Sequence, residues 1–185
     1  MRILVQVFSF LIFLSLTTNI HALEHVSLIK KSVQQWNQWR ENNPEVIPDL
    51  EGINLANANL NNANLAYANL NNANLRGAYF IGSNLKGADL FLANLEGTTL
   101  IMSNLQNANL SMAYLKEADL RVANLKGANF TDADLAAARL YKVHDLTCDQ
   151  INSVKSLNKD TKFPNYLEVK ITGRKKWKCK EVKRK

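Results

Sequence analysis

Residues that interrupt regular structure are scarce in this sequence. Its 185 residues include three prolines and seven glycines, and no proline lies between Leu50 and Leu140. Proline ends helices and inner strands, so a stretch of this length without it favours one continuous regular architecture. The sequence therefore predicts a single patterned block in the middle of the chain.

Residues that carry catalytic chemistry are also few. Of the three histidines, only His25 and His144 lie beyond residue 22. His144 is close in sequence to Asp145, Cys148 and Asp149, but no second cluster completes a metal site or activates a thiol. No glycine-rich phosphate loop occurs either. We expect no enzyme activity, no cofactor, no metal and no small-molecule substrate.

Long apolar runs are confined to the N-terminus. Arg2 precedes a mostly apolar stretch over Ile3–Leu16, and Ala22 offers a small residue at a cleavage point. This pattern is typical of a secretory signal peptide. A membrane anchor is the alternative, although such a stretch falls short of the ~20 residues that span a bilayer. We expect residues 1–22 to be removed and the protein to be exported, either to the periplasm or fully secreted.

Positive charge is concentrated at the C-terminus. The net charge is +7, and residues 174–185 hold eight Lys or Arg and one Glu. Residues 23–173 have 14 basic and 15 acidic side chains, so the body is close to neutral. A basic tail can contact anionic lipid, nucleic acid or an acidic envelope polymer, whereas the plainer interpretation is a solvated tail. The candidate contact residues are Lys175, Lys176, Trp177 and Lys178.

Only two cysteines occur, and both follow the patterned block. An oxidising compartment outside the cytoplasm would favour a disulfide between Cys148 and Cys179. Two free thiols, or a metal-ligand pair without further ligands, are the alternatives.

The middle of the chain has a period of five. Leu or Phe recurs at eighteen positions from Leu55 to Leu140, and the residue two before is small in seventeen of them. In a straight α-helix five residues turn by about 500°, so these leucines would spiral around the axis. In a long strand every second leucine would change face. A short extended piece followed by a turn keeps both positions on one face, and four such pieces close a square coil.

Stretches such as residues 58–62 (Ala-Asn-Leu-Asn-Asn) and 88–92 (Ala-Asp-Leu-Phe-Leu) resemble the motif of the pentapeptide-repeat proteins. That motif is a small residue, Asn or Asp, Leu and two variable residues, and the resemblance covers residue 53 to about residue 142. It implies the fold of that family, an all-β solenoid that forms a right-handed quadrilateral β-helix. Four repeats per coil give about 4.5 coils, or a tower of ~22 Å at the usual strand spacing.

The second position after each leucine predicts the turns. It is Gly or Asn in nine repeats, and both residues tolerate the positive φ at the third residue of a type II turn. Repeats with another residue there, such as Met102 or Val122, are expected to use another turn type.

Both ends of a stacked tower expose unpaired strand edges, which invite aggregation unless they are covered. Upstream, apolar residues at helical spacing predict an amphipathic helix from about residue 24 to 41. Downstream, residues 147–150 (Thr-Cys-Asp-Gln) have the form of a capping box and predict a short helix to about residue 157. We therefore expect α-helical caps at both ends.

Every twentieth residue should lie on the same face of the tower. One face is expected to be exposed and yet rich in apolar side chains, which often marks a protein contact. Contact with the caps, or aromatic stacking between coils, would also account for it. Of the other faces, one carries Asn columns and one alternates Arg76, Glu96 and Lys116. The candidate partner-binding residues are Tyr79, Ile81, Ile101, Met102, Val122 and Tyr141.

The expected organisation is a signal peptide (1–22), an N-terminal cap (23–49), the repeat β-helix (50–142), a C-terminal cap (143–173) and a basic tail (174–185). We predict a non-enzymatic scaffold or protein-interaction module, with a homodimer as one expected form.

Some pentapeptide-repeat proteins protect DNA gyrase from fluoroquinolones by mimicking DNA, which needs a strongly acidic surface. Residues 53–142 instead have seven basic and six acidic side chains. A secreted factor that acts on a host or on neighbouring cells is a third hypothesis.

Overall fold

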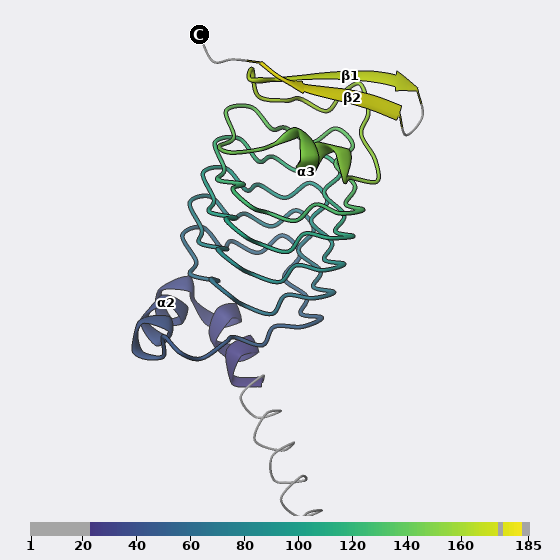
Figure 1. The fold of residues 1–185 in the computed structure, drawn as a ribbon. Coiled ribbons are helices and arrows are strands. Elements are labelled where there is room, and N and C mark those ends of the chain that lie inside the picture. Colours follow the sequence, from purple (N-terminus) through teal and green to yellow (C-terminus); the bar gives the residue numbers. More distant parts are fainter. Residues whose placement is uncertain (1–22, 174–175, 183–185) are drawn as a thin grey trace, which may run out of the picture.

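The chain folds into a tower of stacked coils (Figure 1). The computed structural model describes residues 23–173 and 176–182, and the predicted signal peptide lies outside the described residues. Helical residues lie at one end of the tower, and a short helix with a two-stranded hairpin lies at the other.

Parallel backbone pairing between residues twenty apart builds the tower. The bridges run from Asp49↔Asn69 to Asn124↔His144, so each coil contains four five-residue repeats. Each core leucine donates its N–H to the next coil, as Leu85 N does to Asn104 O at 2.8 Å. This pairing explains why the sequence repeats every five residues and confirms the predicted β-helix architecture.

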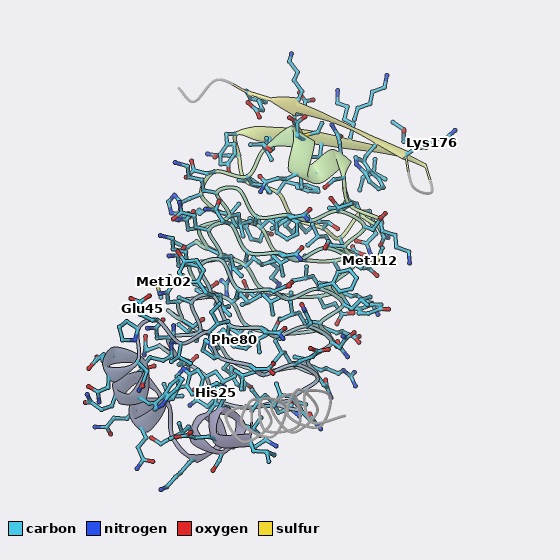
Figure 2. The ribbon with its side chains drawn as sticks, turned by 60° about the horizontal axis from the view of Figure 1, so that its bottom comes forward. His25, Glu45, Phe80, Met102, Met112 and Lys176 are labelled. Atoms are coloured by element: carbon cyan, nitrogen blue, oxygen red, sulfur yellow. A yellow bond between two sulfur atoms is a disulfide. The ribbon has the colours of Figure 1, made fainter. Side chains whose placement is uncertain are left out.

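The leucines and the small residues two positions earlier form one continuous core. Phe80, Phe130 and the leucines at five-residue intervals between them are buried. Figure 2 shows Phe80 inside the coils. Three repeats replace the usual alanine by Ser83, Thr98 or Ser103, which are also buried. Each hydroxyl donates to the carbonyl three residues before it, as in Thr98 Oγ1 to Leu95 O at 2.6 Å. These polar atoms are therefore satisfied inside the core.

One backbone turn closes every corner of the tower. The N–H of the third residue after each leucine donates back to the leucine carbonyl, as in Ala58 N to Leu55 O at 3.0 Å. The residue before that N–H has a positive φ in every repeat, including Met102 at 57° and Val122 at 63°. The prediction of a different turn type at Met102 and Val122 is therefore wrong. Closure of the coil and the ladder hydrogen bonds impose the left-handed conformation whatever the side chain.

Two helical segments lie against the first coil. Residues 23–31 are helical, and α2 spans Val33–Asn42. The single helix that was predicted is interrupted at Ser32, which is extended and caps α2 by accepting a hydrogen bond from Gln35 N. Trp36 and Arg40 lie one turn apart and are buried. Trp36 Nε1 donates to Asn64 O at 2.8 Å, so α2 covers an edge that would otherwise be unpaired.

The C-terminal end combines a helix with a hairpin. Helix α3 spans Cys148–Asn152 and begins with the predicted capping box at Thr147. The predicted extension of this helix to residue 157 is wrong, because the chain returns to the tower and pairs Ser156 with Asp134. Strands β1 (Leu167–Gly173) and β2 (Lys176–Glu181) then form an antiparallel pair. The predicted boundary between residues 173 and 174 falls inside this hairpin, so this end is not capped by helix alone.

Candidate protein-binding face

The six predicted partner-binding residues share one side of the tower. Tyr79 pairs with Thr99 in a column that continues through Asp119 and Arg139. Beside it, the ladder hydrogen bonds Gly82 N to Ile101 O and Val122 N to Tyr141 O join successive coils on the same side. We call this surface the apolar face and define it by these residues: Tyr79, Ile81, Ile101, Met102, Val122 and Tyr141.

The apolar face is open to solvent. Met102 is 58% exposed, Tyr79 48%, Tyr141 44% and Val122 38%, whereas Ile81 and Ile101 are partly buried between their neighbours. The described cap segments therefore leave the centre of this face uncovered. In Figure 2, Met102 and Met112 lie on opposite sides of the tower, with the buried Phe80 between them.

Met102 and Val122 also have an unfavourable backbone conformation. Both occupy the left-handed turn position, which Asn62 and Gly82 fill in the preceding coils of the same column. A side chain with a β-carbon costs roughly 1–2 kcal/mol in this region, and a β-branched one is a clear outlier. No core packing compensates, because both side chains point outward. Other repeats adopt the same conformation, as at Leu92, Met112 and Glu117, so the backbone alone does not mark a contact. The distinguishing feature of Met102 and Val122 is that they join Tyr79 and Tyr141 in one exposed apolar surface.

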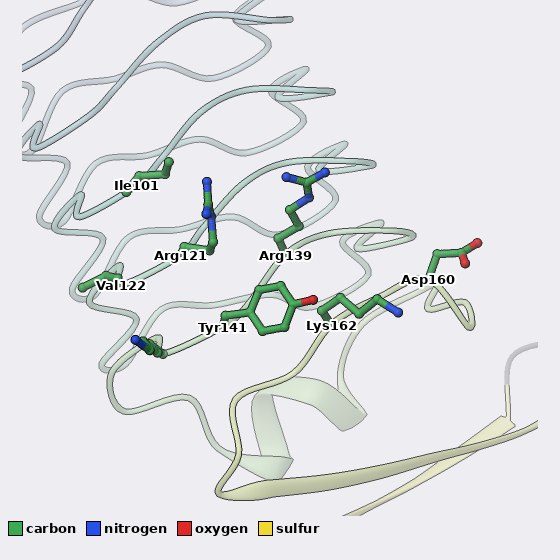
Figure 3. Close-up of a pocket in the computed structure, with 8 residues that line it drawn as sticks. Ile101, Arg121, Val122, Arg139, Tyr141, Asp160 and Lys162 are labelled. Carbon is green, nitrogen blue, oxygen red and sulfur yellow. The ribbon is translucent and has the colours of Figure 1, made fainter.

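The C-terminal part of this face contains a hollow that the sequence analysis missed. It has a volume of about 710 Å³ and is lined by both apolar and charged side chains (Figure 3). We call it the basic hollow. It combines three members of the apolar face with four cations and one acid: Ile101, Val122, Tyr141, Arg121, Arg139, Lys142, Lys162 and Asp160.

Asp119 holds the two arginines of the hollow. Arg121 Nη2 lies 2.8 Å from Asp119 Oδ2, and Arg121 Nε donates to Asp119 Oδ1 at 2.8 Å. The hydrogen bond and charge of Asp119 raise the pKa of Arg121, which stays protonated. Arg139 Nη1 lies 3.8 Å from the same carboxylate oxygen. One carboxylate thus holds Arg121 by hydrogen bonds and lies near Arg139, so the pair of guanidinium groups keeps a net positive charge.

The other faces have structural explanations. On the polar face, Asn84 Nδ2 donates to Asn64 Oδ1 at 3.3 Å, and Asn104 continues the ladder. On another, Glu96 lies 3.7 Å from Arg76 and 3.9 Å from Lys116, which confirms the predicted charge ladder. These amide and charge stacks stabilise neighbouring coils and need no ligand.

The hairpin carries the predicted disulfide and part of the predicted anionic-contact site. Cys148 in α3 is bonded to Cys179 in β2, which confirms the predicted bridge. Trp177 is partly buried, and its Nε1 donates to Ile151 O at 3.1 Å. Lys176 and Lys178 are exposed on the opposite face of the strand, and Lys175 lies outside the described residues.

The titratable residues near His144 are not gathered into one site. No group of three or more His, Cys, Asp or Glu side chains within them could hold a metal ion. The thiol of Cys148 is occupied by the disulfide, and His144 lies in an outward column above Asn124. Within the same residues, no helix combines the length and the hydropathy that crossing a bilayer requires.

Together these features define a β-helical solenoid with an exposed mixed apolar and basic surface. The family model described as pentapeptide repeats matches residues 49–80, 58–97 and 103–141, with eight copies. The chain belongs to the pentapeptide repeat family. Proteins of this family are generally non-enzymatic structural or interaction modules.

Three solved structures illustrate the similarity. A pentapeptide repeat protein from the cyanobacterium Cyanothece 51142 is 28% identical over 71% of this chain and 99% of its own, with a TM-score of 0.41. One from the thylakoid lumen of Arabidopsis thaliana is 30% identical over 55% of this chain and 70% of its own, with a TM-score of 0.31. The plasmid-mediated fluoroquinolone resistance protein QnrB1 is 20% identical over 64% of this chain and 62% of its own, with a TM-score of 0.27. No curated protein matches the chain significantly.

Proposed function

We propose that this protein is a non-enzymatic, exported interaction module of about 4.5 coils between two capping segments, which binds a protein partner through its apolar face. The observation that carries this proposal is the cluster of exposed apolar side chains on one face, which includes Met102 and Val122. Both are exposed, apolar and held at a left-handed turn position that favours glycine or asparagine. Removing them should improve the tower and impair its contacts.

The double replacement Met102→Gly and Val122→Gly tests this directly. Glycine suits the positive φ of both sites, so the free energy of unfolding should stay unchanged or rise by up to about 1 kcal/mol per site. Glycine is preferable to asparagine, because the side chain of Asn62 reaches the space of the next coil, where a β-carbon on Gly82 would lie 2.7 Å from Asn62 Oδ1. Urea denaturation measures stability, while sedimentation velocity and photocrosslinking beside Tyr79 in an envelope fraction measure association.

The matched control is Glu117→Gly with Ala137→Gly. Both residues have the same left-handed conformation, with φ of 62° and 59°, but they lie on the side that carries the charge ladder. The control should show similar stability and unchanged association. If both double variants associate like the parent protein, the apolar face is not the binding surface.

We propose that the protein acts outside the cytoplasm, as the N-terminal pattern predicts. The disulfide between Cys148 and Cys179 supports this, because such bonds persist in oxidising compartments. The intact mass of the protein from fractionated cells and medium, without reductant, is the test. A chain that starts at Leu23 and is two hydrogens light, outside the cytosol, is expected. A full-length reduced chain in the cytosol would contradict export. A periplasmic protein would be found in the periplasmic fraction, whereas a secreted factor would be found in the medium.

Protection of DNA gyrase is the disfavoured alternative. The near-neutral repeat block lacks the acidic surface that a DNA mimic needs, and the basic hollow adds local positive charge. A gyrase supercoiling assay with added protein should show no protection from a fluoroquinolone.

A second binding surface is supported by the hairpin. Lysines on the outer face of β1 and β2 are exposed, and Lys170 lies opposite Lys178 in the register. Glu168 lies 3.1 Å from Lys170 and offsets part of this charge, but the face keeps an excess of lysines that an anionic surface would neutralise. We propose that this outer face contacts an anionic envelope surface. Its described members are Lys170, Lys176, Lys178 and Lys180.

A further inference from the structure

The apolar face changes character along the tower axis. Polar Asn61 lies in the first coil, Ile81 and Ile101 follow in the next two, and Arg121 comes after them in the same column. The surface thus runs from amides through apolar side chains to cations. A ligand that follows this gradient needs an apolar part and an anionic part side by side. Coils are stacked at about 4.8 Å, so the two parts would lie roughly 5–10 Å apart.

The cations of the basic hollow are only partly neutralised from within. Asp119 is shared by Arg121 and Arg139, and their side chains remain 45% and 60% exposed. Among the described residues, no ion pair joins Lys142 or Lys162 to a carboxylate. The hollow therefore keeps guanidinium donors that suit carboxylates, next to lysines that contribute point charge.

The apolar floor of the hollow lies beside these cations. Figure 3 shows Tyr141 between Val122 and Lys162, with its hydroxyl directed toward Lys162. Val122 lies in the adjoining coil and Ile101 one coil further along the tower. A tyrosine ring with a polar tip next to aliphatic and arginine side chains is typical of the centre of a protein contact.

We infer that the basic hollow binds an acidic segment of a protein, in which aspartate or glutamate alternates with apolar side chains. The carboxylates would lie on Arg139, Lys142 and Lys162, and an apolar side chain on Val122 and Tyr141. A nucleic acid fits less well, because it requires a long track of cations and the neighbouring coils supply amides and aliphatic residues instead. This inference rests on the proposed use of the apolar face as a binding surface and names the chemistry of its partner.

The test uses the mature full chain and a ten-residue peptide of alternating Asp and Leu as the probe. Isothermal titration calorimetry at low salt should detect binding. The variant Arg139→Gln with Lys162→Gln should raise Kd at least tenfold. The matched control is Lys86→Gln with Lys126→Gln, which removes the same charge from the polar face and should change Kd less than twofold. A peptide of alternating Asn and Leu should bind at least tenfold more weakly than the acidic one.

Several outcomes would overturn the inference. One is equal loss of affinity in both double variants, because it would show that net charge alone drives binding. Absence of binding by the parent protein is another. A third is a single-stranded oligonucleotide that binds more tightly than the peptide and depends on Arg139 and Lys162.

The glycine variant at Met102 and Val122 separates the two proposals. If only that variant loses self-association or crosslinks, the apolar face is the binding surface and the acidic partner is wrong.

Discussion

Replacement of Trp36 by alanine is expected to lower the free energy of unfolding by about 3–5 kcal/mol and to make the protein aggregate. Trp36 is fully buried between α2 and the first coil. Large-to-small changes at such sites lose both transfer free energy and packing. The change also removes the hydrogen bond to Asn64 O, at the edge where the tower begins. An uncovered edge pairs with other chains, so loss of stability and loss of solubility should appear together.

Two controls separate the contributions of Trp36. Trp36→Phe keeps an aromatic ring but leaves Asn64 O without its donor, and a loss of about 1–3 kcal/mol is expected. Gln38→Ala changes an exposed residue of the same helix and should alter stability by less than about 0.5 kcal/mol. Urea denaturation and light scattering are the measurements. If Trp36→Ala and Gln38→Ala were equally stable and soluble, α2 would not protect the tower.

The tower itself could be predicted because one period encodes it. Each leucine occupies the same environment in every repeat, so the pattern alone identifies the core, the coil and the outward columns. The backbone conformation of the turns was predicted less accurately. Propensity at Met102 and Val122 argued for a different turn, but closure of each coil and the ladder bonds on both sides fix the backbone. Regular architecture therefore overrides local preference in every repeat, including those with Leu92 or Met112 at this position.

The C-terminal end could be predicted only in part, because its contacts are not periodic. The capping box at Thr147 is a local signal and was identified correctly. The hairpin was missed, although apolar and basic residues alternate through β2 as they do in a strand with one covered face. The charge of this segment was interpreted as a tail. Lys162 joins the basic hollow from beyond the repeats, so no spacing in the sequence connects it with Arg139.

Removal of the disulfide is expected to have the second large effect. In the variant Cys148→Ser with Cys179→Ser, the free energy of unfolding should fall by about 3–4 kcal/mol, since the bridge closes a loop with a sequence separation of 31. The bridge is the covalent link between the hairpin and α3, and it is supported by the bond from Trp177 Nε1 to Ile151 O and by packing of Leu167 and Val169 against the core. Strands β1 and β2 should therefore lose protection from hydrogen exchange before the coils do.

Reductant provides the matched control for this prediction. Treatment of the parent protein should reproduce the variant's urea midpoint and exchange pattern, and the same treatment of the variant should change nothing. Unchanged hydrogen exchange in residues 167–173 and 176–181, in the variant or in the reduced parent protein, would contradict the role of the bridge. The disulfide also bears on the compartment in which the protein can function. We expect the exposed lysines of β2 to form one surface only when Cys179 is oxidised, so the proposed anionic contact should depend on the export that the N-terminus predicts.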